Sequence, residues 1–207
     1  MRTALIYLCL LVIPSCSYAS AYGFDIKYYI RGADSGEMSG VKRGFSGSLG
    51  DSDGYDHETQ LPSLPGVCAG FWKVNSIEGW DGTTGLYTWD RRAALTEGER
   101  KTEDIFVWAA PGTQSQDILV AASMSLAQGV NYRLSLVNIP NGVTYIGPRE
   151  WGPDDGTITL PFYDTDDPLT GYKFLAEVTA VPEPSSILTL AGGLAGLGGL
   201  ALKRRKK

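Results

Sequence analysis

The middle of the chain consists of short apolar or alternating runs that are separated by turn-forming residues. The run Phe24–Ile30 alternates apolar and polar side chains, as a strand with one buried face does. Similar runs follow at residues 71–77, 104–110, 117–125, 130–139, 156–163 and 172–180. Pairs such as Pro111-Gly112 and Asn141-Gly142 lie between them and favour tight turns. The pattern predicts an all-β ectodomain, an antiparallel β-sandwich of jelly-roll or immunoglobulin-like type.

Two stretches of the ectodomain fit this pattern less clearly. Residues 93–104 are dense in charge and contain Gly98, which favours a short helix or a solvated loop. Residues 32–70 are rich in Gly, Ser, Asp and Pro, which favours a long loop or a few weak strands. The rest of the ectodomain has no sustained apolar stripe with the 3.6-residue period of a helix.

The N-terminus has the pattern of a secretory signal peptide. Arg2 supplies a positive charge, and the apolar run after it is too short to cross a bilayer as a helix. Ala19 and Ala21 form the small-x-small pattern that signal peptidase needs, which predicts cleavage before Tyr22. The alternatives are a buried N-terminal helix and lipoprotein processing at Cys16.

The C-terminus joins an uncharged apolar run to a basic cluster. Residues 185–202 are long enough, at the lower limit, for a transmembrane helix. Residues 203–207 are all Lys or Arg and would stay on the cytoplasmic side of the membrane. The run contains five glycines, and each would cost a soluble helix about 1 kcal/mol. We therefore predict a C-terminal transmembrane helix over 185–202 rather than a soluble core helix.

The tail as a whole is a recognisable motif. Pro182, Glu183 and Pro184, followed by the apolar run and the basic cluster, resemble the PEP-CTERM sorting signal of bacterial exported proteins. The resemblance implies that an exosortase reads these three residues, cleaves near them, and leaves the protein released or attached at the cell surface. It also implies a Gram-negative-type bacterium that makes extracellular polysaccharide. It does not transfer a catalytic activity, because proteins with this tail have unrelated ectodomains. The predicted domains are a signal peptide (1–21), the ectodomain (22–180) and the sorting signal (181–207).

The ectodomain is acidic and has a single cysteine. All 23 acidic residues lie between Asp25 and Glu183, and residues 22–184 contain only 12 basic residues, which gives this span a net charge of −11. An acidic surface repels phosphate backbones, so we expect no nucleic-acid partner. Once the signal peptide is removed, Cys68 is the one cysteine left, so the domain must be held together without an intramolecular disulfide. We expect Cys68 to be a small buried apolar residue rather than a reactive thiol.

Few residues have the pattern of a catalytic or metal site. His57 is the only histidine and has no nucleophile motif beside it, so we expect a solvated loop residue. Acidic clusters could supply the carboxylate pair of a glycosidase, although sequence does not show the cleft geometry that such an enzyme needs. Asp164, Asp166 and Asp167 are candidate calcium ligands on a loop, with solvated turn carboxylates as the alternative.

Two tryptophans in turn-rich stretches are candidate sugar-binding residues. Trp80 and Trp151 lie next to carboxylates, and a ring beside a carboxylate can stack on a sugar and accept its hydroxyl protons. The alternative is that both rings fold back over the ends of the sandwich. Trp72 and Trp108 lie within strand-like runs and are expected to fill the core.

These observations favour a non-enzymatic exported protein that is structural or adhesive in a polysaccharide-rich envelope, matrix or biofilm. We expect a precursor tethered in the inner membrane and a mature form at the cell surface or outside the cell. The expected partners are signal peptidase and exosortase, the membrane before processing, and extracellular polysaccharide. No cofactor is expected apart from the candidate calcium. The alternatives are a carbohydrate-binding module and a secreted glycoside hydrolase.

Overall fold

The computed structural model describes residues 22–35, 40–49, 54–55, 65–73, 85–145 and 147–181. These residues form two six-stranded sheets and one short 3₁₀ helix, η2, at Pro168–Thr170. The first sheet contains β1 (Phe24–Gly32), β2 (Val41–Ser48), β3 (Gly54–Tyr55), β6 (Trp89–Ala93), β8 (Ile118–Leu126) and β11 (Ile158–Leu160). The second sheet contains β4 (Val67–Lys73), β5 (Gly85–Tyr87), β7 (Arg100–Ala109), β9 (Val130–Asn138), β10 (Glu150–Trp151) and β12 (Tyr172–Ala180).

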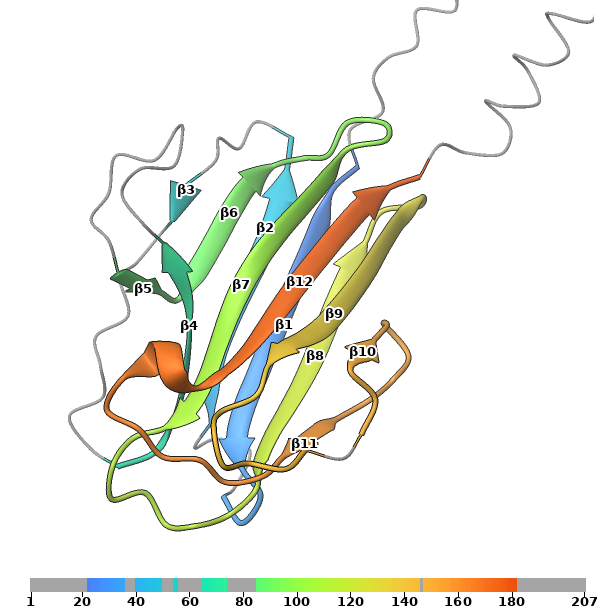
Figure 1. Cartoon of the computed structure of the whole chain (residues 1–207). Coiled ribbons are helices and arrows are strands. Elements are labelled where there is room, and N and C mark those ends of the chain that lie inside the picture. Colours follow the sequence, from blue (N-terminus) through green and yellow to red (C-terminus); the bar gives the residue numbers. More distant parts are fainter. Residues whose placement is uncertain are drawn as a thin grey trace, which may run out of the picture.

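The strand order is β11-β8-β1-β2-β6-β3 in the first sheet and β10-β9-β12-β7-β4-β5 in the second (Figure 1). The strands pair antiparallel, except that β2 and β6 run parallel. The prediction of a mostly β, largely antiparallel ectodomain is confirmed. No helix among the described residues is long and apolar enough to cross a membrane, and the predicted helix over 185–202 lies outside them.

The core lies between the two sheets, which face each other (Figure 1). Side chains of β1 alternate between buried and partly exposed, and Ile26, Tyr28 and Ile30 are buried almost completely. The rings of Tyr28 in the first sheet and Phe71 in the second meet edge to face, with centroids 6.4 Å apart. Alternation along each strand therefore supplies one apolar face per sheet, and the two faces bury each other.

A second apolar cluster lies on the opposite face of the second sheet, over β4, β5 and β7. The register places Cys68 opposite Trp108, and both side chains are 2% exposed. Gly70 leaves room for this packing, because a Cβ there would lie 3.0 Å from the Leu86 side chain. Cys68 is thus buried, as predicted, and Trp108 fills this cluster rather than the core between the sheets.

Both ends of the folded part leave at one end of the molecule (Figure 1). Tyr22 exchanges backbone hydrogen bonds with Leu95 at 2.9 and 3.0 Å, and the Val181 amide donates to the Gly129 carbonyl at 2.7 Å. A Cβ on Gly129 would lie 3.1 Å from both the Tyr22 ring and the Val181 carbonyl oxygen, so the two ends lie together. We call this end, formed by Tyr22, Val181 and the turns at 95–99 and 127–129, the exit pole.

The expectation of a helix or solvated loop at 93–104 is wrong for half of that stretch, since only residues 94–99 form a loop. A turn with Gly98 at φ +76° joins β6 to β7, and β7 begins at Arg100. The charged segment forms a strand because Glu103 points into the protein and pairs with the partly buried Arg92. In the segment at 32–70, β2 is a full strand whose glycines accommodate rings, since a Cβ on Gly44 would lie 2.4 Å from the Trp89 ring.

Candidate functional site

Buried charges tie the two sheets together at β6 and β7. Arg92 of the first sheet contacts Asp90 at 2.9 Å and Glu103 of the second sheet at 3.0 Å, and both carboxylate side chains are 0% exposed. Burial alone would lower the pKa of Arg92, but the charges of Asp90 and Glu103 outweigh it and raise that pKa above its ordinary value. The arginine therefore stays charged, and the three groups act as an ionic link between the layers.

Two further polar contacts cross the same interior. The hydroxyl groups of Tyr28 and Tyr132 are 3.2 Å apart, and burial raises the pKa of both phenols. Arg43 on β2 donates from Nε to the Ala69 carbonyl of the opposite sheet and from a terminal nitrogen to the Lys42 carbonyl at 2.7 Å. Burial lowers the pKa of Arg43 to about 10, so the group is still charged at neutral pH. These contacts hold the interior together and present little reactive surface to solvent.

The candidate sugar residue Trp151 lies in the core. Its ring is 6% exposed and packs against Tyr145 and Phe174, with centroid distances of 6.3 and 6.0 Å. Little of the ring is left to contact a sugar, and the sugar site at Trp151 stays a prediction. Trp80 lies outside the described residues. The same holds for His57 and for the processing residues Ala19, Ala21, Pro182, Glu183 and Pro184.

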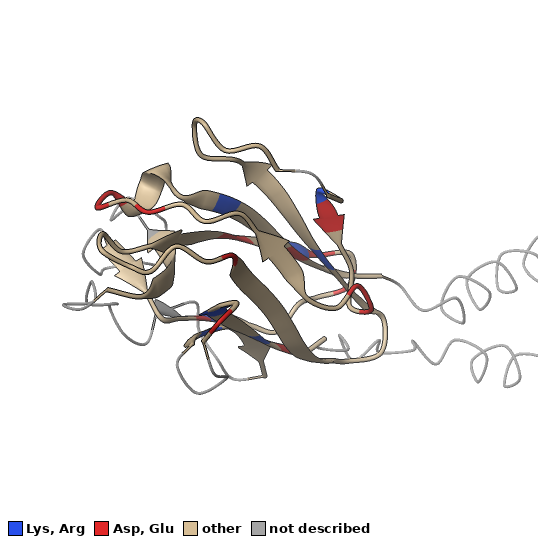
Figure 2. Cartoon of the chain, turned by 90° about the horizontal axis from the view of Figure 1, so that it is seen from below, with Lys and Arg blue, Asp and Glu red and all other residues tan. Residues whose placement is uncertain are grey.

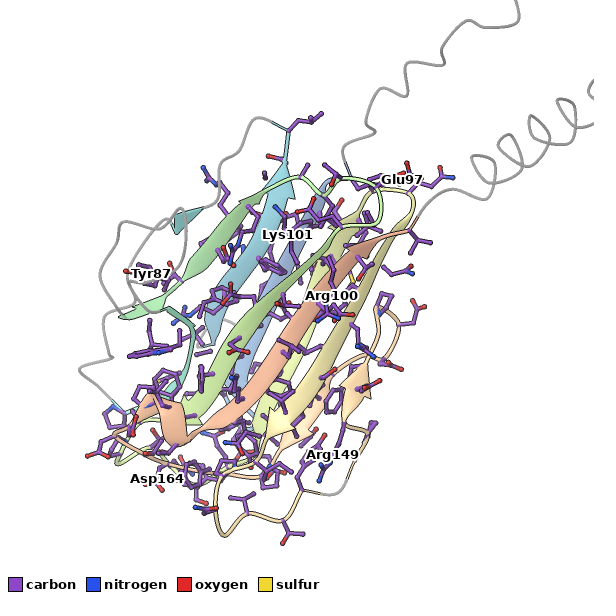
Figure 3. The ribbon with its side chains drawn as sticks, turned by 45° about the horizontal axis from the view of Figure 1, so that its top comes forward. Tyr87, Glu97, Arg100, Lys101, Arg149 and Asp164 are labelled. Carbon is purple, nitrogen blue, oxygen red and sulfur yellow. The ribbon has the colours of Figure 1, made fainter. Side chains whose placement is uncertain are left out.

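The three candidate calcium ligands are exposed at the end opposite the exit pole. Figure 3 shows Asp164 there, and Glu97 at the exit pole. Asp167 caps η2, because its carboxylate accepts a hydrogen bond from the Leu169 amide at 3.0 Å. Within the described part of the chain, no three His, Cys, Asp or Glu residues are grouped so that they could hold a metal ion. The calcium site at Asp164, Asp166 and Asp167 stays a prediction.

Charged residues are scattered over the described ribbon, with short acidic and basic stretches next to each other (Figure 2). On the outer face of the second sheet, Arg133 contacts Glu150 at 3.5 Å and Glu177 at 3.4 Å. Glu177 in turn contacts Arg100 at 3.2 Å. Such exposed pairs contribute little stability, but they keep the local charge balanced.

A groove of about 460 Å³ runs along the edge of β9 beside this ion-pair group. Leu126, Val130 and Pro153 give it an apolar wall. Asn131 and Thr179, together with Arg133 and Glu177, line its polar side. The groove exists because β10 and β11 are short, so each covers only part of its neighbour, β9 or β8. Sequence reasoning did not identify this site, since no motif marks a strand edge.

Comparison with known proteins identifies the tail alone. Residues 180–207 match the family model of the PEP-CTERM protein-sorting motif. No curated protein and no solved structure matches the chain. The motif confirms the predicted resemblance and marks an exported protein that is sorted by an exosortase to the surface or the exterior of the cell.

Proposed function

We propose that the ectodomain is a non-catalytic β-sandwich that serves as a structural or adhesive protein of the cell surface or extracellular matrix. The observation that carries this proposal is the position of the sorting motif relative to the fold. The match begins at residue 180, the last residue of β12, so the sorting signal follows the folded domain without a linker. The proline that follows Val181 lacks an N–H and cannot extend the β12 pairing.

The sheet connections support a jelly-roll-like variant of the sandwich. From β6 to β9 the chain passes to the other sheet with each successive strand. It crosses again from β10 to β11 and from β11 to β12. Repeated crossing between layers is a feature of jelly-roll folds.

The sorting step is tested by mass spectrometry of the mature protein. Wild-type protein should end near Pro184, and Glu183→Ala should accumulate as a membrane-bound precursor. Asp34→Ala is the matched control, because it removes an exposed carboxylate that follows β1, at the end of the domain opposite Val181, and should be processed normally. A mature surface protein that still ends in Lys207 would contradict exosortase processing.

The groove favours carbohydrate binding as a second candidate function. Amide, hydroxyl, guanidinium and carboxylate groups side by side can both donate to and accept from sugar hydroxyls. The test is retention of the mature protein on the polysaccharide of the producing organism. Asn131→Ala and Trp80→Ala probe the groove and the tryptophan hypothesis, and Val137→Ala, an exposed change on the same sheet, is the control. Turnover of that polysaccharide, lost on a single Asp→Asn change, would instead favour a glycoside hydrolase.

A further inference from the structure

One long edge of the first sheet is covered along only part of its length. β8 pairs with β1 along all of its nine residues, but with β11 only from Ile118 to Val120. From Ala121 to Leu126 no described residue pairs with the other side of β8. The side chains of β8 that face the core become more exposed along the same stretch. Val120 is buried, whereas Ala122 is exposed and Met124 is half-buried.

The phase of the β1–β8 ladder shows which backbone groups face outward. At its two ends the Ala127 amide donates to the Gly23 carbonyl and the Ala33 amide donates to the Asp117 carbonyl. In an antiparallel ladder, alternate residues bond to one neighbour and the residues between them face the other side. The odd-numbered residues of β8 therefore bond to β1. The N–H and C=O groups of Ala122, Met124 and Leu126 point away from the sheet.

This uncovered stretch has none of the usual protection of a sheet edge. Residues 118–126 contain no charge, no proline and no glycine. Natural edge strands are normally blunted by lysine, proline or a bulge, or are kept very short. Where β11 covers β8, β11 is itself the edge strand, and it is only three residues long. The uncovered half is an uncharged pairing surface on an otherwise acidic ectodomain.

We propose that this edge pairs with the same edge of a second copy of the chain. A two-fold axis through Met124 sets Ala122 against Leu126 of the other copy, Met124 against Met124, and Ser123 against Ser125. Each of the three outward-facing residues then bonds to its opposite number, which satisfies six backbone groups on each copy. Every opposed pair is uncharged: alanine meets leucine, methionine meets methionine, and serine meets serine.

A second copy fits this edge better than a charged peptide would. The stretch has no charged residue that could attract a charged partner. Two copies of it can pair without any contact between like charges. The pairing also covers Met124 and Leu126, which pack only partly against the core. Because both copies use the same edge, the assembly closes as a dimer and does not grow into a fibre.

The geometry limits where the pairing can occur. β8 runs toward the exit pole and ends beside it (Figure 1). Antiparallel pairing therefore makes the two exit poles point in opposite directions. Copies whose tails lie in one membrane have their exit poles on the same side. If the proposed sorting is correct, pairing therefore follows release from the membrane or joins two facing surfaces.

The test is sedimentation of the mature protein, purified from the cells that make it, over a range of on the order of 10–1000 μM. A short interface of this kind is weak, so wild type should show a reversible monomer–dimer equilibrium. Met124→Lys and Met124→Glu should each raise the dimer dissociation constant about tenfold or more, because like charges then face each other across the axis. An equimolar mixture of the two variants should restore the dimer.

Val137→Lys is the matched control, since it places a charge at an exposed apolar position of β9 and should leave dimerisation unchanged. Circular dichroism checks that each variant is folded. A wild type that stays monomeric over the whole range would overturn the proposal. So would a Met124→Lys protein that remains dimeric, or a mixture of folded variants that stays monomeric. None of these results depends on how the tail is processed.

Discussion

The ionic link between the sheets leads to the sharpest stability prediction. Arg92→Met keeps much of the length of the side chain but removes the charge that the two buried carboxylates share. Asp90 and Glu103 would then face each other in the interior without this counter-charge. Removing one partner of a buried ion group leaves uncompensated charge and typically costs about 3–5 kcal/mol.

The expected effect is large compared with the stability of a domain of this size. Native domains are stable by about 5–15 kcal/mol, so the variant should lose a substantial share of its free energy of unfolding. The midpoint of thermal unfolding should fall by about 6–20 °C, at about 2–4 °C for each kcal/mol. Arg133→Met is the matched control, because Arg133 makes its ion pairs in solvent and should cost about 1 kcal/mol or less.

The assay is urea unfolding followed by circular dichroism, with the slope of the transition as a check on two-state behaviour. A double-mutant cycle with Glu103→Gln measures the coupling between Arg92 and Glu103, which should reach about 1–3 kcal/mol. If Arg92→Met costs no more than Arg133→Met, or if the cycle shows no coupling, the link does not hold the sheets together and the reasoning fails.

Three other predictions concern packing. Burial raises the pKa of the Cys68 thiol to about 11, so a thiol reagent at neutral pH should label it slowly in the folded protein and quickly in denaturant; equal rates would contradict its burial. Trp151→Ala should lower the free energy of unfolding by about 3–5 kcal/mol, measured in urea, and a loss below 1 kcal/mol would show that the ring is not part of the core. Gly44→Ala should destabilise by about 1–3 kcal/mol because of the Trp89 ring, whereas Gly66→Ala, which meets open space, should be nearly neutral in the same assay.

The sequence predicted strands well where one face is apolar and the other polar. The runs at 24–30, 117–125, 130–139 and 172–180 correspond closely to β1, β8, β9 and β12. The pattern failed where charges point inward. Glu103 and Arg92 resemble solvated residues in the sequence, but they pair in the core, so a strand was taken for a helix or a loop.

The candidate sites were harder to predict because they depend on contacts between distant segments. Trp151 has acidic neighbours and a turn after it, which is typical of an exposed ring, yet β10 pairs with β9 and turns the ring inward. The uncovered edge of β8 follows from strand order and from the short length of β11. Neither can be read from local periodicity, which shows only that a strand exists.

If the protein is held by its tail before release, the position of β12 has a mechanical consequence. β12 ends at the exit pole and is flanked on both sides, by β7 and β9, over eight paired residues each. A pull on the tail against an anchor at the far end of the domain runs along this strand, perpendicular to its hydrogen bonds. The two ladders would then be loaded in shear and must yield together. We expect the unfolding force to be higher in this direction than for a pull between the two chain ends, because the second pull peels β1 and β12 apart from one pole. Single-molecule stretching along the two directions compares the two forces directly.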